Sequence, residues 1–393
     1  MTNQDTHSDP TKPHALEGIL VVDFTRVLAG PTCTRMLADA GARVIKIERP
    51  VVGDDTRQMG PFVDDGSSEY FRFANLGKES IALNLKDPND LALVKNMIAR
   101  ADIVVENFRP GVMKGLGLDP ESLVQEHPRL IVCSISGFGQ YGPLHQQAAY
   151  DTVIQALSGI MDATGWPDGS PTRVGTSISD IAAGVMGYAG IVTALVARER
   201  TGRGTTVDVA MLDSTFALLE HGLMDALGIH VRPTRIGNRH PFMYPFDTFA
   251  CKDQPFAICV GNDHLFGILC GVLNLTALPS DTRFSTNALR CENHDALKSA
   301  MEAVLKTDTA GNWRERLEKA GVPVGLVLNV DDTRQLEQIA VRGMVKNVGG
   351  RQVPGTPLKF GAFNSLGTMI PSPTLDDCGA AIRAEFGPRQ EEA

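Results

Sequence analysis

One carboxylate stands apart in this sequence. Asp180 lies among glycines, alanines and small hydroxyls in the stretch VGTSISDIAAG, residues 174–184, and seventeen uncharged residues follow it, 181–197. An aspartate just ahead of a helix is a common N-cap, whose side chain accepts backbone N–H groups. A desolvated carboxylate with small neighbours also has room for a ligand and can act as a nucleophile. The residues themselves leave both interpretations open.

Other nucleophiles and metal ligands lack the required spacing. The seven cysteines are scattered, with no CxxC, and no serine sits in GxSxG. The nine histidines show no HExxH or similar ligand pattern. We therefore expect no disulfide framework, no serine or cysteine nucleophile and no metal site.

Several cations fall at or near the ends of predicted strands, where open α/β sheets bind ligands. They are either scattered surface charges or a phosphate-binding rim. An amide and an aromatic ring, Asn107 and Phe108, follow the run DIVVE and either end a strand or face an adenine ring. The cations are Arg26, Lys46, Arg49, Lys78, Lys86, Arg109 and Lys114.

The elements that carry these residues alternate between apolar runs and amphipathic segments up to about residue 140. GILVVDF, ARVIKIE, DIVVENF and LIVCSISGFG read as strands, and TRMLADAG and LALVKNMIARA as helices. This alternation predicts βαβ units and an α/β fold with a mainly parallel sheet. Because the first βα turn, TRVLAGPTC, carries neither GxGxxG nor GxxxxGK[ST], a dinucleotide or nucleoside triphosphate at that turn is not supported.

Composition is ordinary for a soluble protein, with 43% hydrophobic and 21% charged residues. A net charge of −9 argues against nucleic-acid or membrane partners. The N-terminal segment has no apolar core of the kind a signal peptide needs, and the uncharged run is too Gly/Ala-rich for a membrane span. We expect a cytoplasmic protein.

The pattern of residue types divides the chain into five predicted parts. Residues 1–18 are predicted to be a flexible tail, and 19–211 a large Rossmann-like domain that is completed by 350–393. A linker helix over 212–235 leads to a small α+β domain over 236–338, and 339–349 form a return linker. Two domains are the default at this length.

Taken together, several stretches resemble the class III CoA-transferases, the family of formyl-CoA transferase and carnitine CoA-transferase. The resemblance covers nearly everything after the tail and keeps the order and spacing of the motifs. The stretches include DFTRVLAGPTCTRMLADAGARVIKIERP, FANLGKESIALNLK, VVENFRPGVMKGLGL, SISGFGQYGP, AYDTVIQALSGIMDATG, VGTSISDIAAG, RERTGRGTTVDVAMLD, GNRHP and GTPLKF.

The resemblance implies that Asp180 is the nucleophile and forms, in turn, a mixed aspartyl anhydride and an aspartyl-CoA thioester. Coenzyme A thioesters are then substrates, and no permanently bound cofactor is implied. For coenzyme A, the family pattern carries over to Val27, Arg49, Leu83, Lys86, Asn107, Phe108 and, near the thioester, Tyr150.

The sequence departs from the family pattern at three places. Many relatives place an arginine where this chain has Gly115 beside Lys114, which puts one phosphate contact in doubt. Formyl-CoA transferases carry a glutamine at the position of Leu28 and a glycine-run loop in the second domain. This chain has neither, so oxalate and formate are not the expected substrates.

The resemblance also implies an interlocked homodimer and a small acid as acceptor. Succinyl-CoA is a frequent donor in the family, and Arg26 or Arg239 is a candidate partner for a second anionic group on the acid, a carboxylate or a sulfinate. One alternative is α-methylacyl-CoA racemase, which carries a histidine where this chain has Tyr150. Another is a non-catalytic CoA-binding protein, which the retained Asp180 disfavours.

Overall fold

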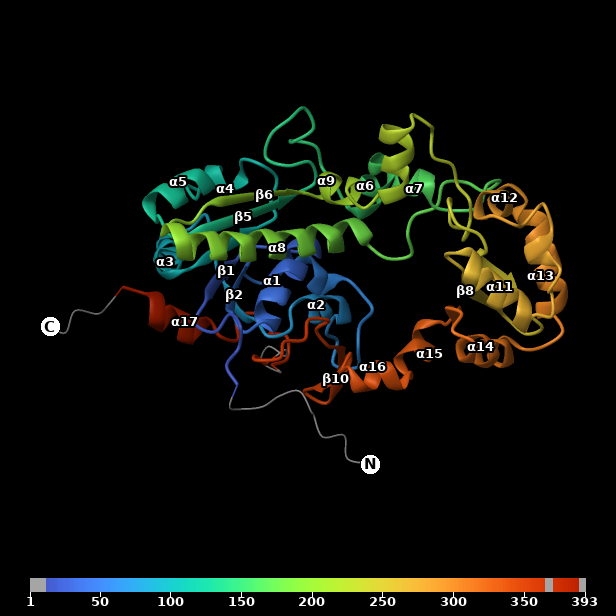
Figure 1. The fold of residues 1–393 in the computed structure, drawn as a ribbon. Helices are drawn as coiled ribbons and strands as arrows, with labels where there is room; N and C mark the ends of the chain where they lie inside the picture. The colour runs from blue at the N-terminus through green and yellow to red at the C-terminus, as the bar shows by residue number, and fades with distance from the viewer. Residues whose placement is uncertain (1–11, 365–369, 389–393) are drawn as a thin grey trace. The chain divides into compact units, whose positions relative to one another are not determined.

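The computed structural model describes residues 12–364 and 370–388. The chain forms two units (Figure 1). The first contains the chain up to Ile160, Arg173–Leu219 and the chain from Glu337 onward, and the second contains Met161–Thr172 and Glu220–Leu336. The segment 161–172 therefore belongs with the second unit, whereas the sequence placed it inside the large domain.

A six-stranded sheet forms the centre of the first unit, and every strand pair in it is parallel. The strand order is β3-β2-β1-β4-β5-β6, so the order reverses between β1 and β4. This is the doubly wound order, and the predicted α/β class with a parallel sheet is confirmed. The strands are β1 Leu20–Asp23, β2 Arg43–Glu48, β3 Glu79–Ala82, β4 Ile103–Glu106, β5 Ile131–Ser136 and β6 Thr206–Ala210.

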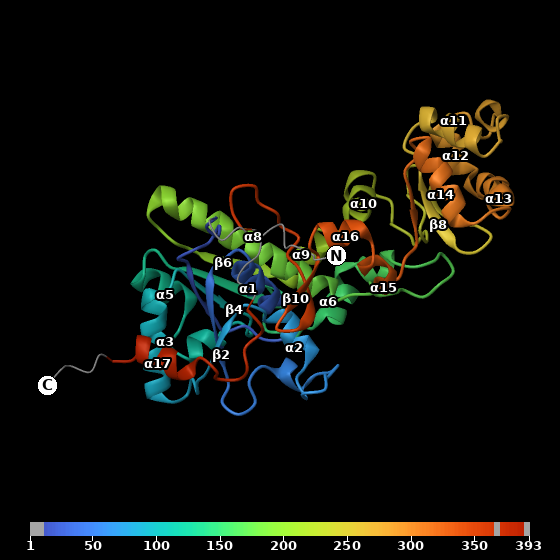
Figure 2. The same ribbon diagram turned by 90° about the horizontal axis from the view of Figure 1, so that it is seen from below.

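Both faces of this sheet are covered, as a parallel sheet requires. Helices α1 (Ala29–Asp39) and α8 (Ile178–Thr201) pack on one face, around Val21, Cys33 and Ile191. Helices α3 (Pro88–Arg100), α5 (Pro120–Glu126) and α17 (Gly379–Phe386) pack on the other (Figure 2). The strands alternate between the two cores, which is why they read as continuous apolar runs.

The remaining helices of the first unit are short and sit mostly at the ends of the strands, where they carry the loops. They are η1 Asp55–Gln58, α2 Glu69–Ala74, α4 Val112–Gly115, α6 Asp151–Ser158, α9 Met211–Phe216 and α16 Glu337–Val341, with α7 Ile160–Ala163 at the boundary between the units.

Helix α8 is long and apolar enough to cross a membrane by length and composition alone. Here it packs along α1, β5 and β6, which accounts for much of its apolar character. Its outer side leaves Val185, Met186 and Val196 about half exposed. The helix is thus less completely covered than its sequence suggests.

The second unit has its own core, built around Tyr244, Phe256 and Trp313. Its antiparallel three-stranded sheet has the order β7-β8-β9, and helices pack against it. Its elements are α10 Glu220–Leu223, η2 Met224–Gly228, β7 Phe246–Ala250, β8 Pro255–Cys259, α11 Asp263–Val272, η3 Leu278–Ser280, α12 Asn287–Glu292, α13 His294–Leu305, α14 Ala310–Lys319, β9 Val324–Leu326 and α15 Val330–Arg334.

Three further predicted segments differ from the structure. Residues 212–235 do not form one linker helix: α9, α10 and η2 are short, and no helix continues beyond Gly228, because Pro233 and the glycines disfavour one. The predicted return linker instead enters a hairpin, β10 (Val345–Val348) with β11 (Arg351–Pro354), turned by Gly349 and Gly350 at positive φ.

The third difference lies in the predicted tail. Residues 12–18 are held in place: His14 bridges to Asn364, and the Leu16 N–H donates to the Ala40 carbonyl at 2.9 Å. Leu16 packs against the core on the α1 side of the sheet. Residues 1–11 lie outside the described residues.

Candidate active site

Two loops meet where the strand order reverses, at the carboxyl ends of β1 and β4. Open α/β sheets bind ligands at this point. Asn107, directly after β4, ties the loops together: its Oδ1 accepts the Arg26 N–H at 2.9 Å, and its Nδ2 donates to the Arg26 carbonyl at 2.8 Å. The amide of Asn107 is therefore engaged with backbone of the β1 loop.

The loop after β1 adopts an uncommon conformation. Val27 has φ of 67°, in the left-handed region that β-branched residues rarely enter. Its N–H donates to Asp54 Oδ1 at 3.2 Å, and Lys46 Nζ donates to the carbonyl of Thr25 at 2.6 Å. Surrounding contacts thus hold this loop in a shape that its own backbone disfavours.

Buried charges support the loop from below. Lys78 Nζ lies 3.0 Å from Asp23 Oδ2 and Lys46 Nζ lies 2.9 Å from Asp54 Oδ2, with all four side chains essentially excluded from solvent. Burial alone would raise the pKa of Asp23, but Lys78 and Lys46 outweigh it and hold that pKa below its usual value. The interpretation of Lys46 and Lys78 as parts of a phosphate-binding rim is therefore wrong, because both ammonium groups are buried in ion pairs with Asp54 and Asp23.

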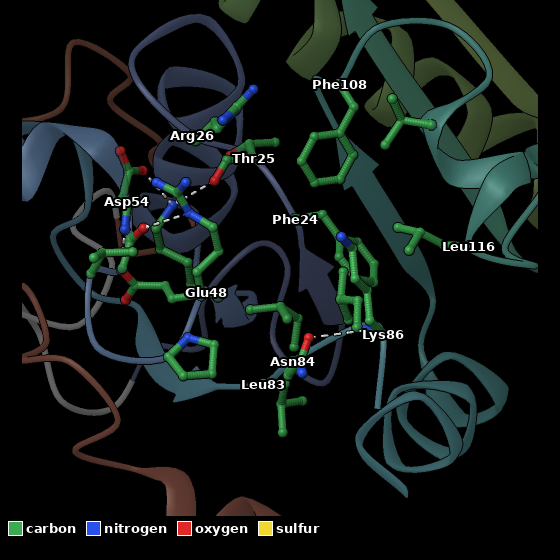
Figure 3. A pocket seen from close by; sticks show the side chains of 18 residues that line it. Phe24, Thr25, Arg26, Glu48, Asp54, Leu83, Asn84, Lys86, Phe108 and Leu116 are labelled. Carbon is green, nitrogen blue, oxygen red and sulfur yellow. Dashed lines mark hydrogen bonds and ion pairs between the residues drawn. The ribbon is translucent and has the colours of Figure 1, made fainter. Parts of the chain in front are cut away.

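An apolar cavity of about 450 Å³ opens beside this loop (Figure 3). Its walls include Phe24, Leu83, Phe108 and Leu116. Arg26, Arg49 and Lys86 also line it, so an apolar floor lies next to positive charge. Such a surface suits a flat aromatic ring that carries phosphates.

The three cations differ in how they are paired. Arg26 Nη1 lies 3.2 Å from Asp55 Oδ2, and Arg49 Nη2 contacts the other oxygen of the same carboxylate. For Lys86 Nζ, the described part of the chain offers no hydrogen-bond acceptor or ion-pair partner. The ammonium of Lys86 is thus available to bind an anion, whereas Arg26 and Arg49 are already paired with the carboxylate of Asp55.

A second cavity, of about 160 Å³, contains Asp180. Val27, Leu28, Asn107 and Tyr150 line it as well. Arg26 and Phe108 line both cavities. A ligand that occupies both would therefore pass Arg26 and Phe108 and end at Asp180.

Asp180 is the third residue of α8, and its carboxylate accepts no hydrogen bond and forms no ion pair with any described residue. Burial, followed by the nearby charge of Asp151, raises its pKa to about 7. The N-terminal N–H of Ser179 is instead accepted by Asp151 Oδ1, at 2.9 Å. Asp180 is therefore not the N-cap of its helix, and the capping alternative is wrong.

The predicted residues fall into place unevenly. Arg49, Leu83 and Lys86 line the first cavity, Val27, Asn107, Tyr150 and Asp180 the second, and Arg26 and Phe108 both. Lys114 lines a third, polar cavity of about 380 Å³ with Glu106 and Arg109. Arg239 belongs to the second unit and stays a prediction.

Sequence reasoning missed three residues near the site. Asp151 caps α8, and Asp55 forms ion pairs with Arg26 and Arg49. Tyr70 lies near Asp180: burial raises the pKa of Tyr70, and the charge of Asp180 raises it further. Asp151 directly follows Tyr150, so adjacency was an available signal. Asp55 and Tyr70 reach the site only through the fold.

A protein-family model described as CoA-transferase family III matches residues 16–377 of this chain. The acetyl-CoA:oxalate CoA-transferase of Acetobacter aceti is 52% identical over 97% of this chain and 98% of its own length. The succinyl-CoA:glutarate CoA-transferase of Homo sapiens is 36% identical over 94% of this chain and 85% of its own length.

A solved structure of similar fold is a CAIB/BAIF family protein from Brucella suis. It is 40% identical, with a TM-score of 0.86, and the match covers 95% of this chain and 100% of that one. Sequence and fold comparisons therefore point in the same direction.

Proposed function

Since this chain belongs to CoA-transferase family III and is a CoA-transferase, we propose that Asp180 is its covalent nucleophile and that it moves coenzyme A from succinyl-CoA to a small dicarboxylic acid. The observation that carries the proposal is the carboxylate of Asp180, which has no described hydrogen-bond or ion-pair partner and lines a cavity that shares Arg26 and Phe108 with the first cavity. An acyl thioester bound along them would present its carbonyl carbon to that oxygen.

The proposed reaction has four steps, each an attack on an acyl carbon. Asp180 attacks the donor thioester, which gives a mixed anhydride and CoA thiolate. The thiolate attacks the aspartyl carbonyl and releases the donor acid, leaving an aspartyl-CoA thioester. The carboxylate of the acceptor acid attacks this thioester to form a new anhydride, and the thiolate then takes the acceptor acyl group and frees Asp180.

The residues of the chain have separate roles in this scheme. The apolar first cavity takes the adenine ring against Phe108 and Leu83, while Lys86 and Arg49 meet the phosphates. Tyr150 and Leu28 flank the thioester end. A small cavity around Asp180 limits water, which would hydrolyse both covalent intermediates.

The acceptor is proposed from chemistry and from relatives. The names of the two relatives above give oxalate and glutarate, both of which carry two carboxylates. Arg26 lines the Asp180 cavity and stays a candidate for the second carboxylate. Because the 52% identical relative is named for oxalate, we include oxalate among the proposed acceptors, in contrast to the expectation from the sequence.

The test is a transfer assay with succinyl-CoA and acetyl-CoA as donors and oxalate, glutarate, mesaconate and 3-sulfinopropionate as acceptors. We expect new acyl-CoA with at least one dicarboxylate, and none with Asp180→Ala. The same substitution at the exposed Asp168 is the control and should leave turnover unchanged. Turnover by Asp180→Ala equal to that of the parent would overturn the proposal.

The racemase alternative has its own measurement. His145 also lines the Asp180 cavity, although its Nδ1 lies 2.7 Å from the Gly142 carbonyl oxygen. Exchange of the α-proton of a 2-methylacyl-CoA in D₂O would support a racemase. We expect no exchange above the rate without enzyme.

We also propose that the protein is a homodimer. Apolar side chains are exposed on α8 (Val185, Met186) and in and just after η2 (Leu227, Ile229). Groups of exposed apolar side chains favour an interface with another chain. Light scattering should give twice the 42.3 kDa chain mass. A mass of one chain at micromolar concentration would contradict the proposal.

A further inference from the structure

The first turn of a helix has N–H groups without partners inside the helix, and they need acceptors from elsewhere. In α8 the N-cap residue, Ser177, forms no side-chain cap. An aspartate at the third position, where Asp180 stands, is well placed to interact with these groups. Here the acceptor comes from another helix: Asp151 Oδ1, on α6, accepts the N–H of Ser179 at 2.9 Å.

Asp151 is itself fixed by a fully buried neighbour. Its other oxygen, Oδ2, accepts Gln155 Nε2 at 2.7 Å. Gln155 Oε1 accepts the N–H of Val174 at 2.8 Å, and Gln155 Nε2 also reaches the Thr176 carbonyl at 3.3 Å. Two side chains of α6 therefore grip the backbone at three points along 174–179, the segment that leads to Asp180.

We propose that Asp151, held by Gln155, is a positioning residue for the Asp180 nucleophile: it takes over the capping of α8, which leaves the Asp180 carboxylate free to react. This inference rests on the proposed function. It assigns Asp151 no contact with the substrate, because Asp151 does not line the cavity that contains Asp180.

Asp151 also acts through its charge. It is buried, with 7% of its surface exposed, and no described cation pairs with it. Beyond the effect of burial, its charge raises the pKa of Asp180. The other titratable or charged groups near Asp180 are Tyr70 from α2 and the cavity residues Arg26, Asp55, Arg109, His145 and Tyr150. A more basic carboxylate is a stronger nucleophile once it is ionised.

Three variants separate the cap from the charge. Asp151→Ala removes both. Asp151→Asn keeps an oxygen for the Ser179 N–H but removes the charge. The double variant Asp151→Asn with Gln155→Glu returns a carboxylate one turn along α6, where it can accept both the Val174 N–H and the new amide.

The assay uses succinyl-CoA with oxalate as probe substrates, and ligand-free ¹³C NMR of the aspartates follows the titration of Asp180. We expect Asp151→Ala to lower kcat by about 10- to 100-fold, with KM for succinyl-CoA changed by less than about threefold. In Asp151→Asn the midpoint of the Asp180 titration should fall by about 0.5 pH unit or more. The double variant should recover part of the lost kcat.

Two results would overturn the inference: kcat of Asp151→Ala within about twofold of the parent, or an Asp180 titration unmoved in Asp151→Asn. If Asp151→Ala does not fold, the Asn variant and the double variant still decide the question. Failure of the proposed function can be distinguished from failure of this inference. If the proposed function is wrong, the unmodified protein shows no CoA transfer, but the NMR titration of Asp180 can still be measured because it needs no substrate.

Discussion

Asn107 grips Arg26 at both ends of its peptide backbone, with its Oδ1 2.9 Å from the Arg26 nitrogen and its Nδ2 2.8 Å from the Arg26 carbonyl oxygen. The sequence resemblance assigned Asn107 to coenzyme A. The geometry adds another task, because the clamp holds the β1 loop, where Val27 adopts a strained φ of 67°. Coenzyme A would meet a loop whose shape is set before binding.

Loss of the clamp should therefore weaken substrate binding. In Asn107→Ala the loop is free to relax, and we expect KM for the CoA donor to rise about tenfold, because displacing a positioning group by about 1 Å can cost up to about 100-fold. Asn107→Asp keeps the acceptor but loses the donor, so its KM should rise as well. Steady-state kinetics decide the matter: an unchanged KM in Asn107→Ala would show that the loop holds its shape unaided.

The first cavity predicts separate effects of its ring and its cation. Phe108→Ala and Lys86→Ala should each raise the Kd for coenzyme A several-fold, because one removes an apolar wall and the other the unpaired ammonium. The effect of Lys86→Ala should shrink as salt is added. Lys95→Ala, at an exposed position on α3, is the matched control. Equal affinities for all variants in calorimetry would place coenzyme A elsewhere.

The buried ion pair below the loop is a stability prediction. Lys78→Met leaves the carboxylate of Asp23 buried without its partner at 3.0 Å, which should cost about 3–5 kcal/mol of unfolding free energy. Asp23→Asn together with Lys78→Met removes both charges and should recover part of that loss. Urea unfolding of the three proteins measures it, and a loss below about 1 kcal/mol for Lys78→Met would contradict the argument.

The pKa of Asp180 predicts how the rate depends on pH. Burial and Asp151 raise this pKa to about 7, and only the ionised carboxylate attacks. We therefore expect kcat/KM to rise with pH, with a midpoint near 7, and then to level off. A rate that is constant from about pH 5 to 8 would mean that Asp180 is already ionised throughout this range.

The same shift affects stability with the opposite sign. The folded protein holds the Asp180 proton to higher pH than the unfolded chain does, so Asp180 costs stability progressively as pH rises from about 4 to about 7. Asp180→Asn lacks this cost. Its unfolding free energy should exceed that of the parent above pH 7, by at most about 4 kcal/mol, and match it near pH 4. Chemical denaturation at both pH values tests this.

Much of the fold was predictable because local patterns specify it. The apolar runs that end at Asp23 and Glu106 predicted the two loops at the point where the strand order reverses. Arg26 and Phe108 follow these runs in the sequence, so their place on the loops was predicted as well. The linker helix was wrong because 212–235 carries helix-favouring residues but also Gly228 and Pro233, and the structure breaks the helix there.

The site itself depended on contacts between distant positions. Asp151 and Ser179 are 28 residues apart, and no local pattern reveals that one caps the other. Asp180 looked like an N-cap for the same reason, since its competitor for that role lies on a different helix. The burial of Lys46 and Lys78 was equally hidden, because their partners come from separate strands and loops.

The most direct test of the account is to trap the covalent intermediate. The protein is mixed with succinyl-CoA, quenched with hydroxylamine, digested and analysed by mass spectrometry. We predict a hydroxamate on Asp180 only, with the buried Asp151 in the same digest as an internal control and no product in Asp180→Ala. Transfer activity without modification of Asp180, or with modification at another residue, would contradict the central claim.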